Sequence, residues 1–199
     1  GIPGEFNVYN SLAAVTTCGI IGIPMEVMQD SQSDMKVRGR LEPVEIPGYA
    51  RIFIDYAHNA VSLENVLTTL RQYRPKRLIC LFGCGGNRSA GRRKGMGFVS
   101  GRLADMTVIT SDNPRFESPE AIMTDIETGV LEGGGEYVKI CSRLDAIRYA
   151  LEISDRDDIV LLAGKGHETY QDIEGRRTQM DEREMIRQIL EEKNAGIVR

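Results

Sequence analysis

The stretch RLICLFGCGG, residues 77–86, is a continuous run of apolar side chains that ends in glycines. A strand buried on one face alternates apolar and polar residues, whereas a strand of a parallel sheet is covered on both faces and does not. Two similar runs, MTVITS (106–111) and DIVLLAG (158–164), also lack alternation. RIFID (51–55) and YVKIC (137–141) are further strand-like segments. Together these segments predict a mainly parallel sheet.

Between these strands the apolar residues recur at the spacing of a helix. VSLENVLTTLRQY (61–73) is the clearest case, and Ser118 with Pro119 suits the start of another helix. A Pro-Gly turn joins two strands within residues 39–55. The other helical segments are residues 95–104, 118–131, 143–153 and 181–193. The alternation of strand and helix predicts an α/β fold that is doubly wound around the sheet.

The first 36 residues differ in character from the rest. Residues 7–22 predict a mostly buried helix that ends near Gly22 and Pro24, and residues 25–36 predict a polar linker with a short helix. A helix this apolar needs a neighbour that covers it. We therefore expect residues 1–36 to belong with another domain of a longer protein, and residues 37–199 to form a domain of their own.

Charge and cysteine content narrow the classes of function. The net charge is −4, whereas nucleic-acid binding favours a basic surface, so no nucleic acid is expected as partner. No apolar run approaches the roughly 20 residues that cross a bilayer, and the first residues lack a signal-peptide pattern. The cysteines form no C-x-x-C pair, so no metal site is predicted, and unpatterned thiols suit the cytoplasm. We expect Cys80 and Cys141 to be small core residues.

Polar clusters follow four of the predicted strands. Ligands of doubly wound sheets bind beyond the carboxyl ends of the strands, where such clusters come together. The clusters contain acids, histidines, asparagines, arginines and a lysine, which suits a zwitterionic or phosphorylated ligand. They span Asp55–Asn59, Gly83–Arg88, Asp112–Arg115 and Gly164–Glu168.

Two glycine-rich segments are close to nucleotide-binding motifs without matching them. In GNRSAGRRK (86–94), Arg92 stands where a Walker A motif has Lys, and Arg93 where it has Ser or Thr. In GKGHET (164–169), Thr169 takes the place of the third glycine of a dinucleotide fingerprint. Simpler interpretations stay open at this point: residues 112–114 as an Asx-type turn, the basic run at 88–94 as a solvated face, and Lys165 as an exposed lysine.

Six motifs, taken together, resemble one family. They are GEFNVYNSLAA (4–14), GRLE (39–42), DYAHN (55–59), FGCGGNRSAGRRKGMG (82–97), TSDNPR (110–115) and AGKGHETYQ (163–171), and their order and spacing are similar to those of the Mur ligases that build peptidoglycan precursors. Within that family the resemblance is to members that add diaminopimelate. It implies that residues 37–199 are the C-terminal, Rossmann-like domain, and that residues 1–36 are a helical remnant of the central ATPase domain.

The resemblance also implies a reaction and its partners. Such ligases use ATP and Mg²⁺ to phosphorylate the D-glutamate of UDP-N-acetylmuramoyl-L-Ala-D-Glu, and the amino group of meso-diaminopimelate then attacks the acyl phosphate. The C-terminal domain delivers the amine, which is catalysis by positioning. The phosphate-binding loop lies in the missing central domain, so this chain alone is expected to be inactive. No catalytic residue and no metal ligand is assigned in it.

Roles carry over to residues that match the motifs. Diaminopimelate has one more carboxylate than lysine, and a guanidinium can hold a carboxylate by two parallel hydrogen bonds. Arg115 would hold that far carboxylate with Arg88 and Asn113, Pro114 would aim Arg115, and Glu168 would pair with the neighbouring ammonium. The whole diaminopimelate group is Arg88, Asp112, Asn113, Pro114, Arg115, Gly164 and Glu168, and the group near ATP is Asn7, Arg40, Asp55 and His58.

Three alternatives to a diaminopimelate ligase remain. Within the family, the chain could come from a lysine-adding or a cyanophycin-synthetase-like ligase, although Arg115 argues against a lysine enzyme. A folylpolyglutamate synthetase relative is a second alternative, but residues 112–115 and 164–168 do not follow its pattern. The third is a non-catalytic module that binds an amino acid with the same fold.

Overall fold

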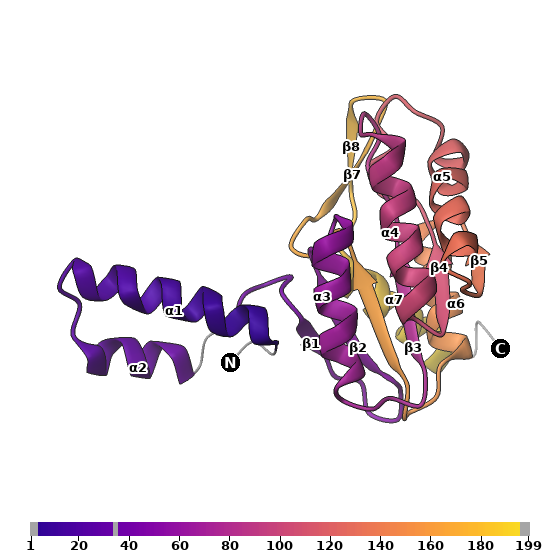
Figure 1. Cartoon of the computed structure of the whole chain (residues 1–199). Coiled ribbons are helices and arrows are strands. Elements are labelled where there is room, and N and C mark those ends of the chain that lie inside the picture. Colours follow the sequence, from indigo (N-terminus) through magenta and orange to yellow (C-terminus); the bar gives the residue numbers. More distant parts are fainter. Residues whose placement is uncertain (1–3, 34–35, 196–199) are drawn as a thin grey trace.

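A six-stranded sheet forms the centre of the molecule (Figure 1). The computed structural model describes residues 4–33 and 36–195. Strand β1 pairs antiparallel with β2, and the remaining neighbours pair in parallel in the order β1-β2-β6-β3-β4-β5. The strands are β1 (Glu42–Val44), β2 (Arg51–Asp55), β3 (Leu78–Phe82), β4 (Met106–Ile109), β5 (Tyr137–Lys139) and β6 (Ile159–Ala163). The predicted mainly parallel sheet is confirmed.

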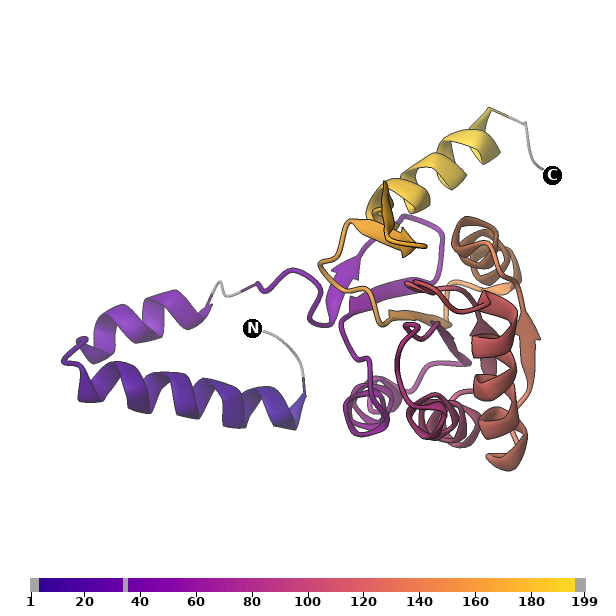
Figure 2. The same ribbon diagram turned by 90° about the horizontal axis from the view of Figure 1, so that it is seen from above.

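Helices cover both faces of this sheet (Figure 2). Helices α3 (Ala60–Arg71), α4 (Ala90–Leu103) and α5 (Pro119–Glu132) lie on one face, and α6 (Arg143–Ile153) and α7 (Glu182–Asn194) on the other. The N-cap expected at Ser118 is present, because its hydroxyl accepts a hydrogen bond from the amide of Ala121 at 3.3 Å. The doubly wound α/β fold is therefore confirmed.

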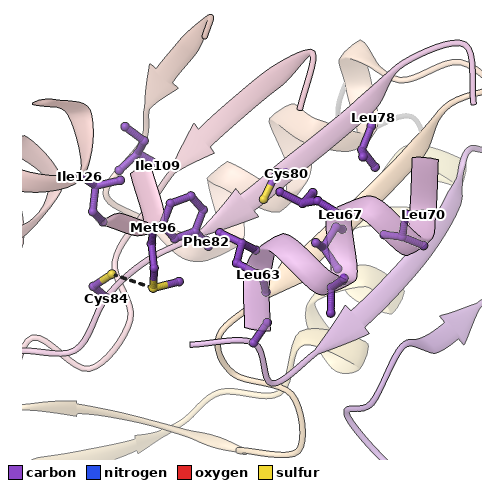
Figure 3. Close-up of a cluster of buried hydrophobic side chains, with 14 of the residues drawn as sticks. Leu63, Leu67, Leu70, Leu78, Cys80, Phe82, Cys84, Met96, Ile109 and Ile126 are labelled. Atoms are coloured by element: carbon purple, nitrogen blue, oxygen red, sulfur yellow. Dashed lines mark hydrogen bonds between the residues drawn. The ribbon is translucent and has the colours of Figure 1, made fainter. Parts of the chain in front are cut away.

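The two faces explain why the strands read as continuous apolar runs. In β3, Leu78, Cys80 and Phe82 pack toward α3, α4 and α5, where Figure 3 shows them with Leu63, Leu67 and Met96. The alternate residues Ile79 and Leu81 pack toward α6 and α7. Every residue of β3 is fully buried, as a strand between two helical layers requires. Cys80 is a core residue as expected, but Cys141 follows β5 at its end and is exposed.

A second, two-stranded sheet was not predicted from the sequence. Strands β7 (Tyr170–Ile173) and β8 (Arg176–Gln179) form an antiparallel hairpin. Its two-residue turn is Glu174-Gly175, and both residues have positive φ, at 51° and 76°. That conformation is typical of the tightest hairpin turns. Arg115 forms an isolated parallel bridge with Ile173, so the hairpin is attached to the loop that follows β4.

The amino-terminal part forms two helices that project from the domain beside β1 and β2 (Figure 1). They are α1 (Glu5–Ile20) and α2 (Met25–Ser33). The expectation that α1 is mostly buried is wrong for this chain, since no residue of α1 is buried. In its first turn Phe6 packs against the core of the domain. No helix among the described residues has the length and apolar character needed to cross a membrane.

Candidate functional site

The candidate site lies where four adjacent strands end. The chain leaves β3 for α4 on one face of the sheet and leaves β6 toward α7 on the other (Figure 2), and sheets wound in this way bind ligands at the carboxyl ends of such strands. A pocket of about 130 Å³ lies there. Six of the seven residues predicted to bind diaminopimelate line it: Arg88, Asp112, Asn113, Arg115, Gly164 and Glu168. The topology therefore brings the predicted group together.

The loops after β3 and β4 are joined at Gly86. The amide of Gly86 donates a hydrogen bond to the carbonyl oxygen of Asn113 at 2.8 Å, and its own carbonyl accepts one from Nη1 of Arg115, also at 2.8 Å. A Cβ atom at Gly86 would lie 1.9 Å from the carbonyl oxygen of Pro114, so only glycine allows this approach. Pro114 itself is not a lining residue but forms part of this contact.

The direction of Arg115 depends on the unpredicted hairpin. Arg115 has a left-handed backbone conformation, with φ of 52°. Its amide donates to the carbonyl oxygen of Asp172 at 3.0 Å, and its carbonyl accepts from the amide of Glu174 at 2.7 Å. Such a conformation is costly for a residue with a side chain and persists where surrounding bonds impose it. The backbone of Asp172 and Glu174 in the hairpin thus holds Arg115 in place.

Three of the four arginines that line the pocket form no ion pair within the described part of the chain. Arg115 is half-buried and its guanidinium donates to the carbonyl of Gly86, and Arg88 is exposed. Within residues 4–33 and 36–195, neither forms an ion pair. A third lining residue, Arg92, donates through Nε to the carbonyl of His58 at 2.9 Å. The pocket thus presents positive charge that a ligand carboxylate can neutralise.

Arg93 differs from its neighbours in the basic run. Its side chain is only 4 % exposed and forms ion pairs with Glu117 at 2.8 Å and Asp125 at 3.0 Å. Glu117 also accepts a hydrogen bond from the amide of Asn87. The interpretation of residues 88–94 as one solvated face is therefore wrong at Arg93, which supports the loop between β3 and α4.

Lys165 belongs to the polar cluster that follows β6, but the sequence assigned no role to it. The interpretation of Lys165 as an exposed lysine is wrong, because its side chain is 0 % exposed. Nζ of Lys165 donates to Oδ1 of Asn113 at 2.9 Å, to Oε2 of Glu168 at 3.0 Å and to the carbonyl of Tyr170 at 2.6 Å. Lys165 therefore connects the loops after β4 and β6 from behind the pocket.

The groups around Glu168 favour its carboxylate over the neutral acid. Burial alone would raise the pKa of Glu168, but hydrogen bonds and charge from Lys165, with further bonds from Asn113 and Tyr56, bring that pKa below its ordinary value. Nδ2 of Asn113 donates to Oε2 at 3.0 Å, and the Tyr56 hydroxyl lies 3.4 Å from Oε1. Glu168 can therefore offer an anionic acceptor to a ligand ammonium at neutral pH.

The four residues expected near ATP are divided between two places. Asn7, Arg40 and Asp55 line a second cavity of about 680 Å³ between α1 and α3, whereas His58 lines the first pocket. Arg40 lies over the ring of Tyr56, with Cζ 4.9 Å from the ring centroid. Tyr56, which also faces Glu168, therefore lies between the two cavities.

Asp55 and His58 are held by backbone groups. The oxygens of Asp55 accept hydrogen bonds from the amides of Leu41 and Ala57, each at 2.7 Å. Burial raises the pKa of Asp55, and these amides oppose that rise. Nδ1 of His58 lies 2.8 Å from the carbonyl oxygen of Tyr56, and because a carbonyl only accepts, Nδ1 is the donor of this hydrogen bond.

Curated relatives share nearly the whole chain. The chain is 46% identical over 191 residues to a UDP-N-acetylmuramoyl-L-alanyl-D-glutamate–2,6-diaminopimelate ligase of Caldanaerobacter subterraneus subsp. tengcongensis. It is 41% identical over 195 residues to the ligase of that name from Clostridium botulinum. Each alignment covers 96% of this chain and 40% of the relative. The chain thus spans about two fifths of the length of the relatives it matches.

Solved structures and a family model agree with these relatives. A structure of a UDP-N-acetylmuramoyl-L-alanyl-D-glutamate–2,6-diaminopimelate ligase matches 97% of this chain and 40% of its own, with a TM-score of 0.75 and 34% identity. A UDP-N-acetylmuramate-alanine ligase of Thermotoga maritima shares the fold, with a TM-score of 0.69 at 19% identity over 98% of this chain and 39% of its own. The family model for the Mur ligase, glutamate ligase domain, matches residues 39–166, more than half of the 199 residues. The chain therefore belongs to the Mur ligase family and contains its glutamate ligase domain.

Proposed function

We propose that this chain is part of an ATP-dependent ligase that adds meso-diaminopimelate to UDP-N-acetylmuramoyl-L-Ala-D-Glu in the cytoplasm. The relatives named above carry this activity in their names and share 41–46% of their residues with the chain where they align. Residues 37–199 would bind the incoming amino acid, and residues 1–36 would belong with the ATPase domain.

The charge pattern of the first pocket is the observation that carries this proposal. Arg88 and Arg115 supply positive charge without an acidic partner in the described part of the chain. Glu168, in the same pocket, supplies a carboxylate held in its charged form. The far end of diaminopimelate carries one carboxylate and one ammonium, which are the two charges that these groups complement.

Each pocket residue then has a role that its contacts support. Arg115 would hold the far carboxylate with Arg88, while Pro114 and the β7 backbone keep Arg115 in position. Asn113 uses its Oδ1 for Lys165 and one N–H for Glu168. Its second N–H is left to donate to the far carboxylate of diaminopimelate. Asp112 would hold the turn through the amide of Asn113, at 2.6 Å from Oδ1. Gly164 would offer backbone contacts beside Glu168.

The same pocket would discriminate against lysine. Lysine lacks the far carboxylate, so the guanidinium of Arg115 would be desolvated by the ligand without receiving an acceptor. A site built to pair with a polar group rejects analogues that lack this group by about 10⁴-fold. A lysine-adding ligase would not need the charge that Arg88 and Arg115 place in this pocket.

ATP would approach from the side of the second cavity. Asn7 and Arg40 line it, and Asp55 would act by holding the backbone of Leu41 and Ala57 there. His58, at the first pocket, would lie where the nucleotide and the amino acid meet. Among residues 4–33 and 36–195, no three acidic, histidine or cysteine side chains are placed to hold a metal ion, so no step is assigned to magnesium.

A ligation assay tests the function. The ligase that contains this chain, given ATP and UDP-N-acetylmuramoyl-L-Ala-D-Glu, should release phosphate and form the tripeptide product with meso-diaminopimelate. Lysine at the same concentration should give little product. A preference for lysine would overturn the assignment of Arg115, and binding of diaminopimelate without any ligation would favour the non-catalytic module.

A further inference from the structure

We propose that Lys165 is a positioning residue for the recognition of the ligand ammonium: it holds one oxygen of Glu168 so that the other faces the pocket. The identity of the ligand in this inference rests on the proposed function. The contacts of Lys165 and Glu168 do not depend on the proposed function, because they are present in the chain without any ligand.

Lys165 cannot contact the ligand itself. Its side chain is 0 % exposed and does not line the pocket. An ammonium group has three N–H donors, and Lys165 directs one each to Asn113, Glu168 and the carbonyl of Tyr170. All three distances lie between 2.6 and 3.0 Å. With every donor engaged, Lys165 can act only through the groups that it holds.

The two oxygens of Glu168 have different surroundings. Oε2 accepts hydrogen bonds from both Lys165 and Asn113, at 3.0 Å each. Among the residues that the structure describes, Oε1 has one partner, the Tyr56 hydroxyl, at the long distance of 3.4 Å. The carboxylate is therefore anchored at one oxygen, and the other retains the capacity to accept a hydrogen bond from a ligand ammonium.

Lys165 also supplies the charge that Glu168 requires. The side chain of Glu168 is 17% exposed, and Asp112 adds a second carboxylate, 3.9 Å from Nζ of Lys165. Without Lys165, the neutral acid would be favoured by burial and by repulsion between the carboxylates, and a neutral acid binds an ammonium weakly. The other ionisable groups around this pocket come from the loops after β2, β3 and β4, from α4 and from β7: Tyr56, His58, Cys84, Arg88, Arg92, Arg93, Arg115 and Tyr170.

A titration of Glu168 in the 199-residue chain tests this inference without any ligand. The ¹³C resonance of the Glu168 carboxyl, assigned through Glu168→Gln, should titrate in the unaltered chain at a pH below the ordinary value for glutamate. In Lys165→Met, which keeps the length and removes the charge, it should titrate at a higher pH. Lys76→Met is the matched control, because Lys76 is exposed and pairs with Asp155 ahead of β3, at the other end of the strands. Equal titration of Glu168 in all three chains would overturn the inference.

A second measurement needs no variant that must fold. In the unaltered chain, the ¹⁵N resonance of the Lys165 ammonium should shift at the pH at which Glu168 takes up its proton, because the two groups share a hydrogen bond. A Lys165 resonance that does not respond to this titration would contradict the inference even if Lys165→Met is unfolded.

Kinetics separate this inference from the proposed function. In the complete ligase, Lys165→Met should raise KM for diaminopimelate about tenfold to a hundredfold at pH 7. KM should recover toward the unaltered value as the pH is raised, while kcat changes less. A purely structural role for Lys165 would not give recovery at high pH. If the ligase does not use diaminopimelate at all but Glu168 titrates as expected, the proposed function fails and the role of Lys165 remains.

Discussion

Nη1 of Arg115 donates a hydrogen bond to the carbonyl oxygen of Gly86 at 2.8 Å, so the loop after β3 holds the side chain that extends from the loop after β4. The amide of the same glycine donates to the carbonyl of Asn113. This pair of bonds requires the two loops to approach so closely that a methyl group at residue 86 would overlap Pro114. The position of the Arg115 guanidinium in the pocket therefore depends on a glycine at residue 86.

Gly86→Ala should separate the two loops. Its Cβ would lie 1.9 Å from the carbonyl oxygen of Pro114, so we expect a loss of about 1–3 kcal/mol in the free energy of unfolding. Urea denaturation measures that loss. The matched control is Gly91→Ala in α4, where a Cβ would meet no atom within 4 Å. It should be neutral or stabilising by up to about 1 kcal/mol. Equal stability of the two variants would show that the approach at Gly86 is not restrictive.

Asp55→Asn should destabilise the fold although it is nearly isosteric. Both oxygens of Asp55 accept backbone amides, and an asparagine would place an N–H donor against one of them. The expected loss is about 1–3 kcal/mol, measured by urea denaturation. Glu64→Gln on the exposed side of α3 is the control and should change stability by less than about 0.5 kcal/mol. A loss no larger in Asp55→Asn than in this control would contradict the account of Asp55.

The contribution of Glu168 to stability should depend on pH in a defined direction. Its pKa in the folded chain lies below the ordinary value of 4.5, because the hydrogen bond and charge of Lys165 outweigh the effect of burial. The unfolded chain therefore takes up this proton at a higher pH than the folded chain. The stabilisation is fully present above about pH 4.5 and is lost as the pH falls through the folded-state pKa.

Urea denaturation of Glu168→Gln and of the unaltered chain at several pH values measures this pH-dependent contribution of Glu168 to stability. The difference in unfolding free energy between the unaltered chain and Glu168→Gln should be largest near neutral pH. It should shrink as the pH is lowered below 4.5. A difference that stays constant from pH 7 to pH 3 would mean that the charge of Glu168 does not contribute to stability.

The sequence predicted that the pocket residues lie close together, because parallel strands place their carboxyl ends at one edge of the sheet. Asp112, Arg115, Gly164 and Glu168 all follow strands whose carboxyl ends meet at one edge. The burial of Arg93 could also have been predicted from the sequence, by a different pattern. Arg93 stands three, four and seven residues before the buried Met96, Gly97 and Ser100, which is helical spacing. Because the helix was expected to begin at residue 95 and begins at Ala90, that relation was missed.

Other features depend on contacts that no local pattern encodes. The polar residues of β7 and β8 lack the apolar alternation that marks a strand, and the hairpin depends on the turn at Glu174-Gly175 and on its bonds to Arg115. Burial of Lys165 depends on acceptors from Asn113 and Tyr170, which only the fold brings together. The apolar composition of α1 predicts that the helix packs against another element, but it does not identify that element. In the described structure no residue of α1 is buried.

The most direct test of the central claim is the ratio of kcat/KM for meso-diaminopimelate to that for lysine, measured in the ligase that contains this chain. The unaltered ligase should prefer diaminopimelate by about 10⁴-fold. Arg115→Ala should lose most of that preference through weaker use of diaminopimelate, whereas Arg102→Ala, on the exposed side of α4, should retain it. An unchanged ratio in Arg115→Ala would contradict the claim that this guanidinium holds the far carboxylate.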